Sequence, residues 1–222
     1  MAGRRSSRVE VVLPELEERG GPPGAGEDLD GVLLRGVDLR GARLDDLRLL
    51  ESSLVGCRLD GASLRGARLV SSVLDDLAAT EVDLTGSSWR DVVLSGSRAG
   101  VLRLGDADLV RTRVSGCRLH HVDARGADLA DVLLEDCVLG ELDLTDARAA
   151  RVRLVRCRVE RLVLTGSRLE ELDVSRADVA RLTGPGDLAG VVMGEDQATG
   201  FAVVLAEHLG VRVVASEAGP QA

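Results

Sequence analysis

The sequence predicts an all-β fold, a right-handed quadrilateral β-helix (solenoid) closed by a short C-terminal capping helix. Three observations support this prediction. Apolar residues recur every five positions from Leu34 to Val179, and these thirty positions hold 21 Leu, four Val, four Ala and Trp89. A second series, two residues earlier in each unit, is apolar or small throughout. The positions between the two series hold mostly Arg, Asp, Glu, Gly, Ser and Thr, which favour solvent.

A period of five fits neither the 3.6 residues of a helical turn nor the alternation of an ordinary strand. If each unit is a short extended piece that ends in a corner, four units close a coil of twenty residues. Residues ten apart then face each other across the interior. Trp89 tests this geometry, because Ala79 and Ala99 stand ten residues before and after it, where Leu is the rule. The small alanines leave space for the large indole ring, as close packing of the interior requires.

The repeat divides the chain into three parts. Residues 1–28 are an N-terminal extension and linker, in which VEVVLPEL is a candidate covering strand and GGPPGAG a flexible link. Residues 29–182 form the solenoid. Residues 183–222 form a C-terminal cap, with a helix at about 196–209 whose N-cap would be Asp196 and whose stop would be Gly210. The segment VRVV at 211–214 is expected to add a short strand before a disordered tail. Caps are needed because a solenoid otherwise exposes its core and strand edges.

Residues that often carry chemistry do not converge in this register. The four cysteines, at 57, 117, 137 and 157, fall in the second inward series and are interpreted as small core residues rather than metal ligands or disulfides. His120 and His121 fall on a corner, and His208 falls in the expected helix. We therefore expect no catalytic residue, metal or cofactor, and no enzymatic activity.

Units such as GADLA, GVDLR, EVDLT, DADLV and ELDLT resemble the pentapeptide-repeat family, whose motif is A-(D/N)-L-x-x with Leu or Phe in the centre. The resemblance extends over roughly 150 residues. The sequence departs from the motif by using Arg at the D/N position, as in GARLD, and by having no central Phe. The resemblance implies a solenoid. It also implies two partners found in some members: a type II topoisomerase bound by imitation of DNA, and a second copy bound through the apolar C-terminal helix.

One predicted wall of the solenoid is acidic, the wall centred on Leu64, Leu84 and Leu104. Arginines at 43, 65, 103 and 125 interrupt this row, and most of the net charge of −9 lies in the terminal segments. A solvated face of mixed charge is therefore favoured over a continuous imitation of phosphates. The candidate acidic residues are Asp83, Asp106, Asp123, Asp143 and Asp146.

A second candidate surface is apolar where solvent is expected. It consists of outward positions on two adjacent walls, and exposed apolar strips often mark contacts with other proteins. Stacking of side chains on neighbouring coils is an equally good explanation. The residues are Leu50, Val70, Val73, Val93, Val110 and Leu133.

These features favour a noncatalytic structural and protein-interaction scaffold, because a cylinder lacks the cleft that an enzyme site needs. The alternative is a DNA-mimicking modulator of DNA gyrase or another topoisomerase that protects it from quinolones. The expected partner is a protein, with a possible homodimer through Phe201, Leu205 and Leu209. The acidic balance disfavours direct binding of nucleic acid. The chain has no apolar stretch long enough for a membrane span, so we expect a cytoplasmic location.

Overall fold

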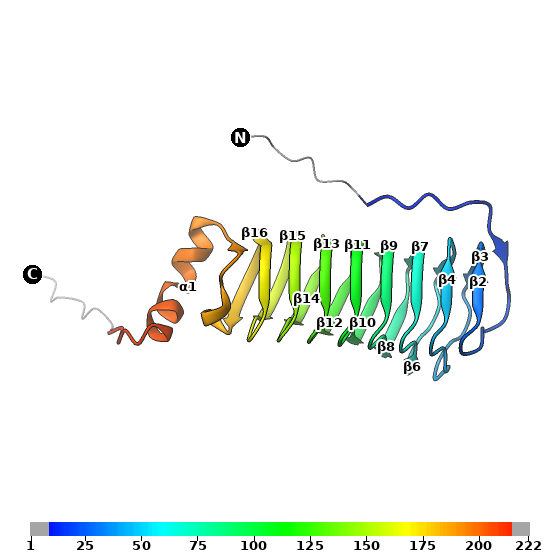
Figure 1. Ribbon diagram of the computed structural model, residues 1–222, viewed down its shortest axis with the longest axis horizontal. Helices are drawn as coiled ribbons and strands as arrows, with labels where there is room; N and C mark the ends of the chain where they lie inside the picture. Colours follow the sequence, from blue (N-terminus) through cyan, green and yellow to red (C-terminus); the bar gives the residue numbers. More distant parts are fainter. Residues whose placement is uncertain (1–8, 215–222) are drawn as a thin grey trace, which may run out of the picture.

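The computed structural model describes residues 9–214 as a long parallel β-solenoid with one α-helix at its C-terminal end (Figure 1). The early coils contain short strands, and the later ones contain longer strands that bend around corners. The strands of the first coils are β1 (Glu17–Glu18), β2 (Asp28–Asp30), β3 (Val32–Arg35), β4 (Arg48–Leu50), β5 (Ser53–Val55) and β6 (Ala62–Ser63). The later strands are β7 (Arg68–Asp75), β8 (Ala78–Asp83), β9 (Ser88–Ser95), β10 (Arg98–Arg103), β11 (Asp108–Ser115), β12 (Arg118–Asp123), β13 (Asp128–Glu135), β14 (Val138–Asp143), β15 (Arg148–Val163) and β16 (Arg168–Thr183).

From β2 to β15 the strands pair in parallel with the chain twenty residues away, which confirms the predicted coil length. The ends differ: β1 pairs with residues fifteen positions later, and the last pairing, near residue 191, is with residues nineteen positions earlier. Leu69 lies opposite Leu49 and Trp89, and the same register continues from Trp89 to Leu109 and Leu129. We name the four sides by their buried central residues. Wall 1 is centred on Leu49, Leu69, Trp89, Leu109, Leu129 and Ala149; wall 2 on Leu54, Leu74, Leu94, Val114, Leu134 and Leu154; wall 3 on Leu59, Ala79, Ala99, Leu119, Leu139 and Val159; wall 4 on Leu64, Leu84, Leu104, Ala124, Leu144 and Leu164.

The two inward series form one continuous core. Trp89 is 1% exposed, and Ala79 and Ala99 pack against the same core from the opposite wall. The indole N–H of Trp89 donates to the hydroxyl of Ser87 at 2.9 Å, so the ring buries no unpaired donor. The four cysteines are buried and form no disulfide, and the thiol of Cys137, for example, points to the carbonyl of Glu135 at 3.3 Å. Burial raises the pKa of the Cys57 thiol, in keeping with a core role.

The corners use two different backbone conformations. Three of the four columns of corner residues have positive φ, with Gly at many positions and Asp, Glu, Ser or Arg at others, such as Asp91 with φ 53° and Arg111 with φ 49°. The corner between walls 3 and 4 changes after Gly61, and from β8 onward the strand runs through it without positive φ. Here Gly100 and Gly140 are required for a different reason, since an added Cβ would lie 2.4 Å from the carbonyl oxygens of Thr80 and His120.

The N-terminal end of the solenoid is covered by β1, which pairs with β3. The amides of Glu17 and Arg19 donate to the carbonyls of Gly31 and Leu33 at 2.8 and 2.9 Å. The expected covering strand VEVVLPEL, residues 9–16, does not form, and the pairing begins one residue after it. Pro14 lies within that segment and has no amide to donate to a ladder. The first coil begins in the glycine-rich segment, because the amide of Gly26 donates to the carbonyl of Asp45 at 2.8 Å.

The C-terminal end is closed by a 3₁₀ turn (Pro185–Asp187), strand β17 (Val191–Val192) and helix α1 (Glu195–His208). The side-chain amide of Gln197 donates to the carbonyls of Val174 and Ala177 at 2.9 and 2.8 Å, which satisfies acceptors on the last coil. Phe201 is the buried residue of the helix.

Two expectations about this end were wrong. The N-cap is Gly194 rather than Asp196, and the side chain of Gln197 accepts a hydrogen bond from the amide of Gly194 at 2.8 Å, which is one half of a capping box. Residues 211–214 form no strand: the pairing position beside β16 is taken by β17, and the helix leads the chain away from it. The expected disordered tail, residues 215–222, lies outside the described residues.

The compensation between Trp89 and the alanines across from it predicts a non-additive pair of substitutions. Ala79→Leu should destabilise the solenoid by about 1–3 kcal/mol, because the added methylene groups overpack the space opposite Trp89. In a Trp89→Leu background the same change should cost much less, since the smaller side chain leaves room. Urea unfolding of the four proteins in this cycle measures the difference. If the losses of unfolding free energy from the two substitutions were additive, residues 79 and 89 would not share the same interior space.

Candidate interaction surfaces

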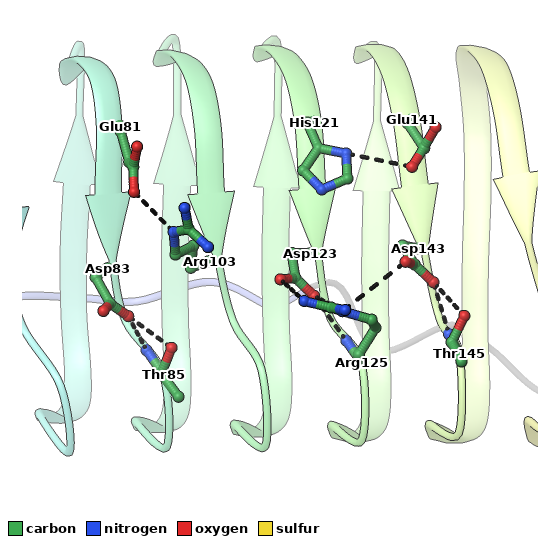
Figure 2. Close-up of polar contacts among 10 residues, drawn as sticks. All are labelled: Glu81, Asp83, Thr85, Arg103, His121, Asp123, Arg125, Glu141, Asp143 and Thr145. Atoms are coloured by element: carbon green, nitrogen blue, oxygen red, sulfur yellow. Dashed lines mark hydrogen bonds and ion pairs between the residues drawn. The ribbon is translucent and has the colours of Figure 1, made fainter.

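Three of the acidic candidates, Asp83, Asp123 and Asp143, lie in one column on wall 4, and their carboxylates form hydrogen bonds within the solenoid. In this column, just before the wall centre, Asp83 pairs in register with Arg103, Arg103 with Asp123, and Asp123 with Asp143. Each Asp carboxylate turns toward the residue two positions later (Figure 2). Asp83 accepts from the hydroxyl and amide of Thr85 at 2.6 and 3.0 Å, and Asp143 accepts from Thr145 at 2.6 and 2.9 Å.

Asp123 is the most enclosed of these carboxylates, with a side chain 8% exposed. It accepts two hydrogen bonds from the guanidinium of Arg125, both at 2.7 Å, and the backbone amide of Arg125 lies 3.3 Å away. The side-chain bonds to Arg125 lower the pKa of Asp123 below its usual value, although burial acts in the opposite direction. Asp123 is therefore a structural anion of the wall, and little of its charge faces a partner.

The arginines that interrupt this wall are also tied internally. Arg65 bonds to Asp83 at 2.9 Å, Arg103 bonds to Glu81 at 2.7 Å, and Arg125 also lies 4.0 Å from Asp143. These pairs neutralise much of the column, so the structure supports the expected face of mixed charge rather than a continuous row of carboxylates.

Two of the five acidic residues, Asp106 and Asp146, lie apart from this column on the corner between walls 4 and 1. Both have positive φ, 54° and 57°, and neither has an ion-pair partner among residues 9–214. Their carboxylates lie over glycines of the next coil: a Cβ at Gly126 would meet a carboxylate oxygen of Asp106 at 2.5 Å. The alternation of Asp and Gly on this corner therefore makes space for carboxylates that remain available to solvent.

At the corner between walls 3 and 4, sequence reasoning placed His121 but missed two residues of the same column, Glu81 and Glu141. Glu81, His121 and Glu141 belong to one column, with Val101 between the first two, and the imidazole Nδ1 of His121 lies 3.4 Å from Glu141 (Figure 2). They extend the charged surface of wall 4 around this corner. Because these residues are spaced by multiples of twenty, the sequence could have predicted that they lie in one column.

The six apolar candidates lie in two columns rather than one continuous strip, and an arginine interrupts each column. Arg90 stands between Val70 and Val110, and Arg113 stands between Val93 and Leu133. Leu50, Val70 and Val110 lie on wall 1, and Val73, Val93 and Leu133 lie on wall 2. Leu50 is 42% exposed, whereas the others are partly buried by their neighbours. The corner between the columns carries ion pairs, with Asp91 bonded to Arg111 and Asp131 to Arg151, each at 2.6 Å.

The expected dimer residues differ in their exposure. Phe201 is buried, Leu205 is partly buried against the core, and Leu209 is 79% exposed. Exposed valines lie along the same segment, at 203, 204, 211, 213 and 214. The first two residues therefore plug the last coil, and Leu209 with the valines is the part left for a second molecule. A dimer through this surface stays a prediction.

Residues 9–214 include no group of three or more His, Cys, Asp and Glu side chains placed to hold a metal ion. The same residues include no helix that is long and apolar enough to cross a membrane.

Comparison with protein families supplies the identity of the repeat. Residues 33–76 and 103–140 match the model for pentapeptide repeats, in eight copies. The chain is a pentapeptide-repeat protein. The twenty-residue register extends the same coil through the stretch between the two matches and onward into β15 and β16. No curated protein matches the sequence.

Solved structures of other pentapeptide-repeat proteins resemble this one at low identity. HetL, involved in heterocyst differentiation regulation in the cyanobacterium Nostoc sp. strain PCC 7120, is 20% identical, with 76% of this chain and 90% of HetL covered and a TM-score of 0.38. A trypsin-treated variant of QnrB1, a plasmid-mediated fluoroquinolone resistance protein, is 17% identical, with 91% and 98% covered and a TM-score of 0.30. Neither likeness is close enough to transfer a residue's role.

The enclosed carboxylate predicts a pH-dependent loss of stability in this pentapeptide-repeat protein. Asp123→Asn should cost about 1.5–3 kcal/mol near neutral pH, because it removes charge-assisted hydrogen bonds. The pKa of Asp123 is lowered in the folded protein, so its contribution is complete above the unfolded value of about 3.9 and is lost as the pH falls through the folded value.

The difference in unfolding free energy between wild type and variant should therefore shrink below about pH 4. Urea unfolding at several pH values measures it. Asp106→Asn is the matched control, since that carboxylate has no ion pair among the described residues, and it should change stability little. If the loss of unfolding free energy caused by Asp123→Asn did not change with pH, the role of the ionised Asp123 carboxylate in stability would be contradicted.

Proposed function

We propose that this protein is a noncatalytic scaffold for protein interaction. The observation that carries the proposal is the strict twenty-residue register, which stacks outward side chains into straight columns. Adjacent strands lie about 4.8 Å apart, so each column offers a partner side chains at fixed intervals. Such columns need no reorganisation on binding, which lowers the entropic cost of association.

The apolar columns on walls 1 and 2 are the proposed contact. The paired charges of the corner between them, Asp91 with Arg111 and Asp131 with Arg151, are held in place and remain partly solvated. A partner that covers this edge would bury Leu50 and the partly exposed valines at the centre while the charged corner stays at the rim. This arrangement of apolar centre and polar rim is common in protein interfaces.

Charged substitutions on this edge should abolish partner capture without unfolding the solenoid. Val70→Asp with Val110→Asp places carboxylates on both sides of Arg90 in the wall 1 column, where burial under a partner would be unfavourable. The measurement is capture of cross-linked partners from native lysate by each protein, with identification by mass spectrometry. A partner held by the wild type should be lost by this variant.

The matched control is Val101→Asp with Val163→Asp, which changes two partly exposed valines on wall 4 and its corner with wall 3. It should keep the same partner, and circular dichroism should show both variants folded. Equal capture by the wild type and the apolar-edge variant would contradict the proposed contact surface.

A second candidate function is modulation of a type II topoisomerase through the acidic corner. The observation in its favour is the pair Asp106 and Asp146, two coils apart and without ion-pair partners among the described residues. Against it stand the internal ion pairs of wall 4, which neutralise the remainder of the row.

This second candidate predicts that the protein inhibits DNA supercoiling by gyrase, or protects gyrase from a quinolone, at near-stoichiometric amounts. Asp106→Asn with Asp146→Asn should weaken the effect, because it removes two corner carboxylates that face solvent without an ion-pair partner among the described residues. A supercoiling assay with titrated protein measures both. Absence of any effect at a large excess of wild-type protein would exclude this candidate.

A further inference from the structure

Wall 3 carries two arginines without an ion-pair partner in the described part of the chain. Arg98 on β10 and Arg118 on β12 lie directly in register on adjacent coils. Both are exposed, and neither forms an ion pair with any of residues 9–214. The outward positions of wall 3 between Ala78 and Gly140 also hold no carboxylate, so this stretch is positive in a chain of net charge −9. Those positions are Ala78, Thr80, Arg98, Gly100, Arg118, His120, Val138 and Gly140.

In the other pairs of arginines stacked in register, at least one member has a carboxylate partner; Arg48 of the Arg48 and Arg68 pair, for example, lies 3.2 Å from Asp28. Arg148 lies against Arg168, but it also pairs with Asp128 at 3.3 Å. Arg161 lies against Arg181, and these two pair with Glu141 and Glu160. Like charges directly opposite each other on neighbouring strands are unfavourable. The Arg98 and Arg118 pair retains this repulsion, which an anion bound between the two guanidinium groups would relieve.

The surface beside Arg118 is hollowed. A shallow hollow of about 530 Å³ is lined by Arg118, Val138, Gly140 and Arg158, and its lining also includes Glu160, which pairs with Arg181. Arg98 lies on the preceding coil, outside this hollow. Gly100 and Gly140 place no side chain beside the arginines, and neither position accepts one, because a Cβ would meet the carbonyl oxygen of the previous coil at 2.4 Å. Val138 is 49% exposed at the same place. The guanidinium groups are therefore open to a segment that lies along the wall.

We propose that wall 3 binds a short acidic segment of a partner protein, whose carboxylates pair with Arg98 and Arg118. Guanidinium groups bind carboxylates through two parallel hydrogen bonds. In an extended segment, alternate side chains point to one side at intervals of about 6.6–6.8 Å, so carboxylates two residues apart can reach arginines on adjacent coils. Val138 then contacts an apolar side chain of the segment.

A protein segment fits this patch better than a nucleic acid does. The positive stretch covers only the coils between Ala78 and Gly140, and carboxylates stand on both neighbouring corners, at Asp76, Glu81, Asp136 and Glu141. Phosphates repeat continuously along a nucleic acid and would lie against these carboxylates. A short segment with few carboxylates avoids that repulsion. The inference rests on the proposed scaffold function but uses a face opposite wall 1.

Binding of synthetic peptides tests the inference. The probe is a fluorescein-labelled nonapeptide with Glu at alternate positions and one Val, and its control has Gln in place of every Glu. Anisotropy titrations should show saturable binding of the Glu peptide only. Arg98→Gln with Arg118→Gln should weaken that binding about tenfold or more, which corresponds to about 1.4 kcal/mol.

Arg68→Gln with Arg168→Gln is the matched control, because these arginines are exposed on wall 1 and form no ion pairs within residues 9–214. It should bind the Glu peptide about as the wild type does, and thermal unfolding should confirm that both double variants are folded. Equal losses in the two variants, or no saturable binding to the wild type, would overturn the proposal. A single-stranded oligonucleotide of the same charge that displaces the peptide with equal affinity would overturn the choice of a protein segment.

The variant with Val70→Asp and Val110→Asp should bind the peptide as the wild type does, because those residues lie on wall 1. A failure of the acidic-segment proposal therefore leaves the apolar-edge result unaffected. Loss of peptide binding by the wall 1 variant would contradict the separation of the two faces.

Discussion

The whole molecule depends on hydrogen bonding between neighbouring coils, in which residues twenty positions apart stand in register. Each coil donates to the next through its extended segments, as in the bond of 2.8 Å from the amide of Leu84 to the carbonyl of Arg103. A change of one residue in this register would turn inward side chains to the surface on a whole wall. The repeat must therefore keep the same length over many coils. From β2 to β15 the pairing register shows no shift.

The same register decides what the surface can do. Because every outward residue stands above the residue twenty positions later, charges either alternate along a column or accumulate in it. Alternation gives internal ion pairs, as at Asp91 and Arg111 or Asp131 and Arg151. Such exposed pairs add little stability individually. They do fix the direction of the side chains, and they leave those groups with less charge to offer to a partner.

The sequence was sufficient to predict the solenoid because the period of five is repeated over thirty units. The compensation at Trp89 also determined the coil length, since Ala79 and Ala99 can only matter to Trp89 if ten residues span half a coil. The ends were harder to predict. They occur once, so no period constrains them, and they are decided by individual hydrogen bonds. Gln197, for example, satisfies two carbonyls of the last coil and selects Gly194 as the N-cap.

The candidate surfaces were predictable as columns but not as contacts. Spacing alone put Asp83, Asp123 and Asp143 on one wall. It could not show that their carboxylates would turn back to Thr85, Arg125 and Thr145, because that depends on side-chain rotation within a coil. It also could not distinguish arginines that form ion pairs, such as Arg103, from arginines that form none within residues 9–214, such as Arg118.

This distinction between paired and unpaired charges identifies the surfaces that are open to partners. A charge already satisfied within the solenoid would have to break its bonds before it could bind elsewhere, at a cost comparable to the gain. Charges without internal partners face no such cost. By this criterion, Asp106 and Asp146 on the corner are the acidic candidates whose charge is available to a partner. The arginines that already pair with a carboxylate are not available in the same way. Arg98 and Arg118 on wall 3 are therefore the cations best placed to select an acidic partner.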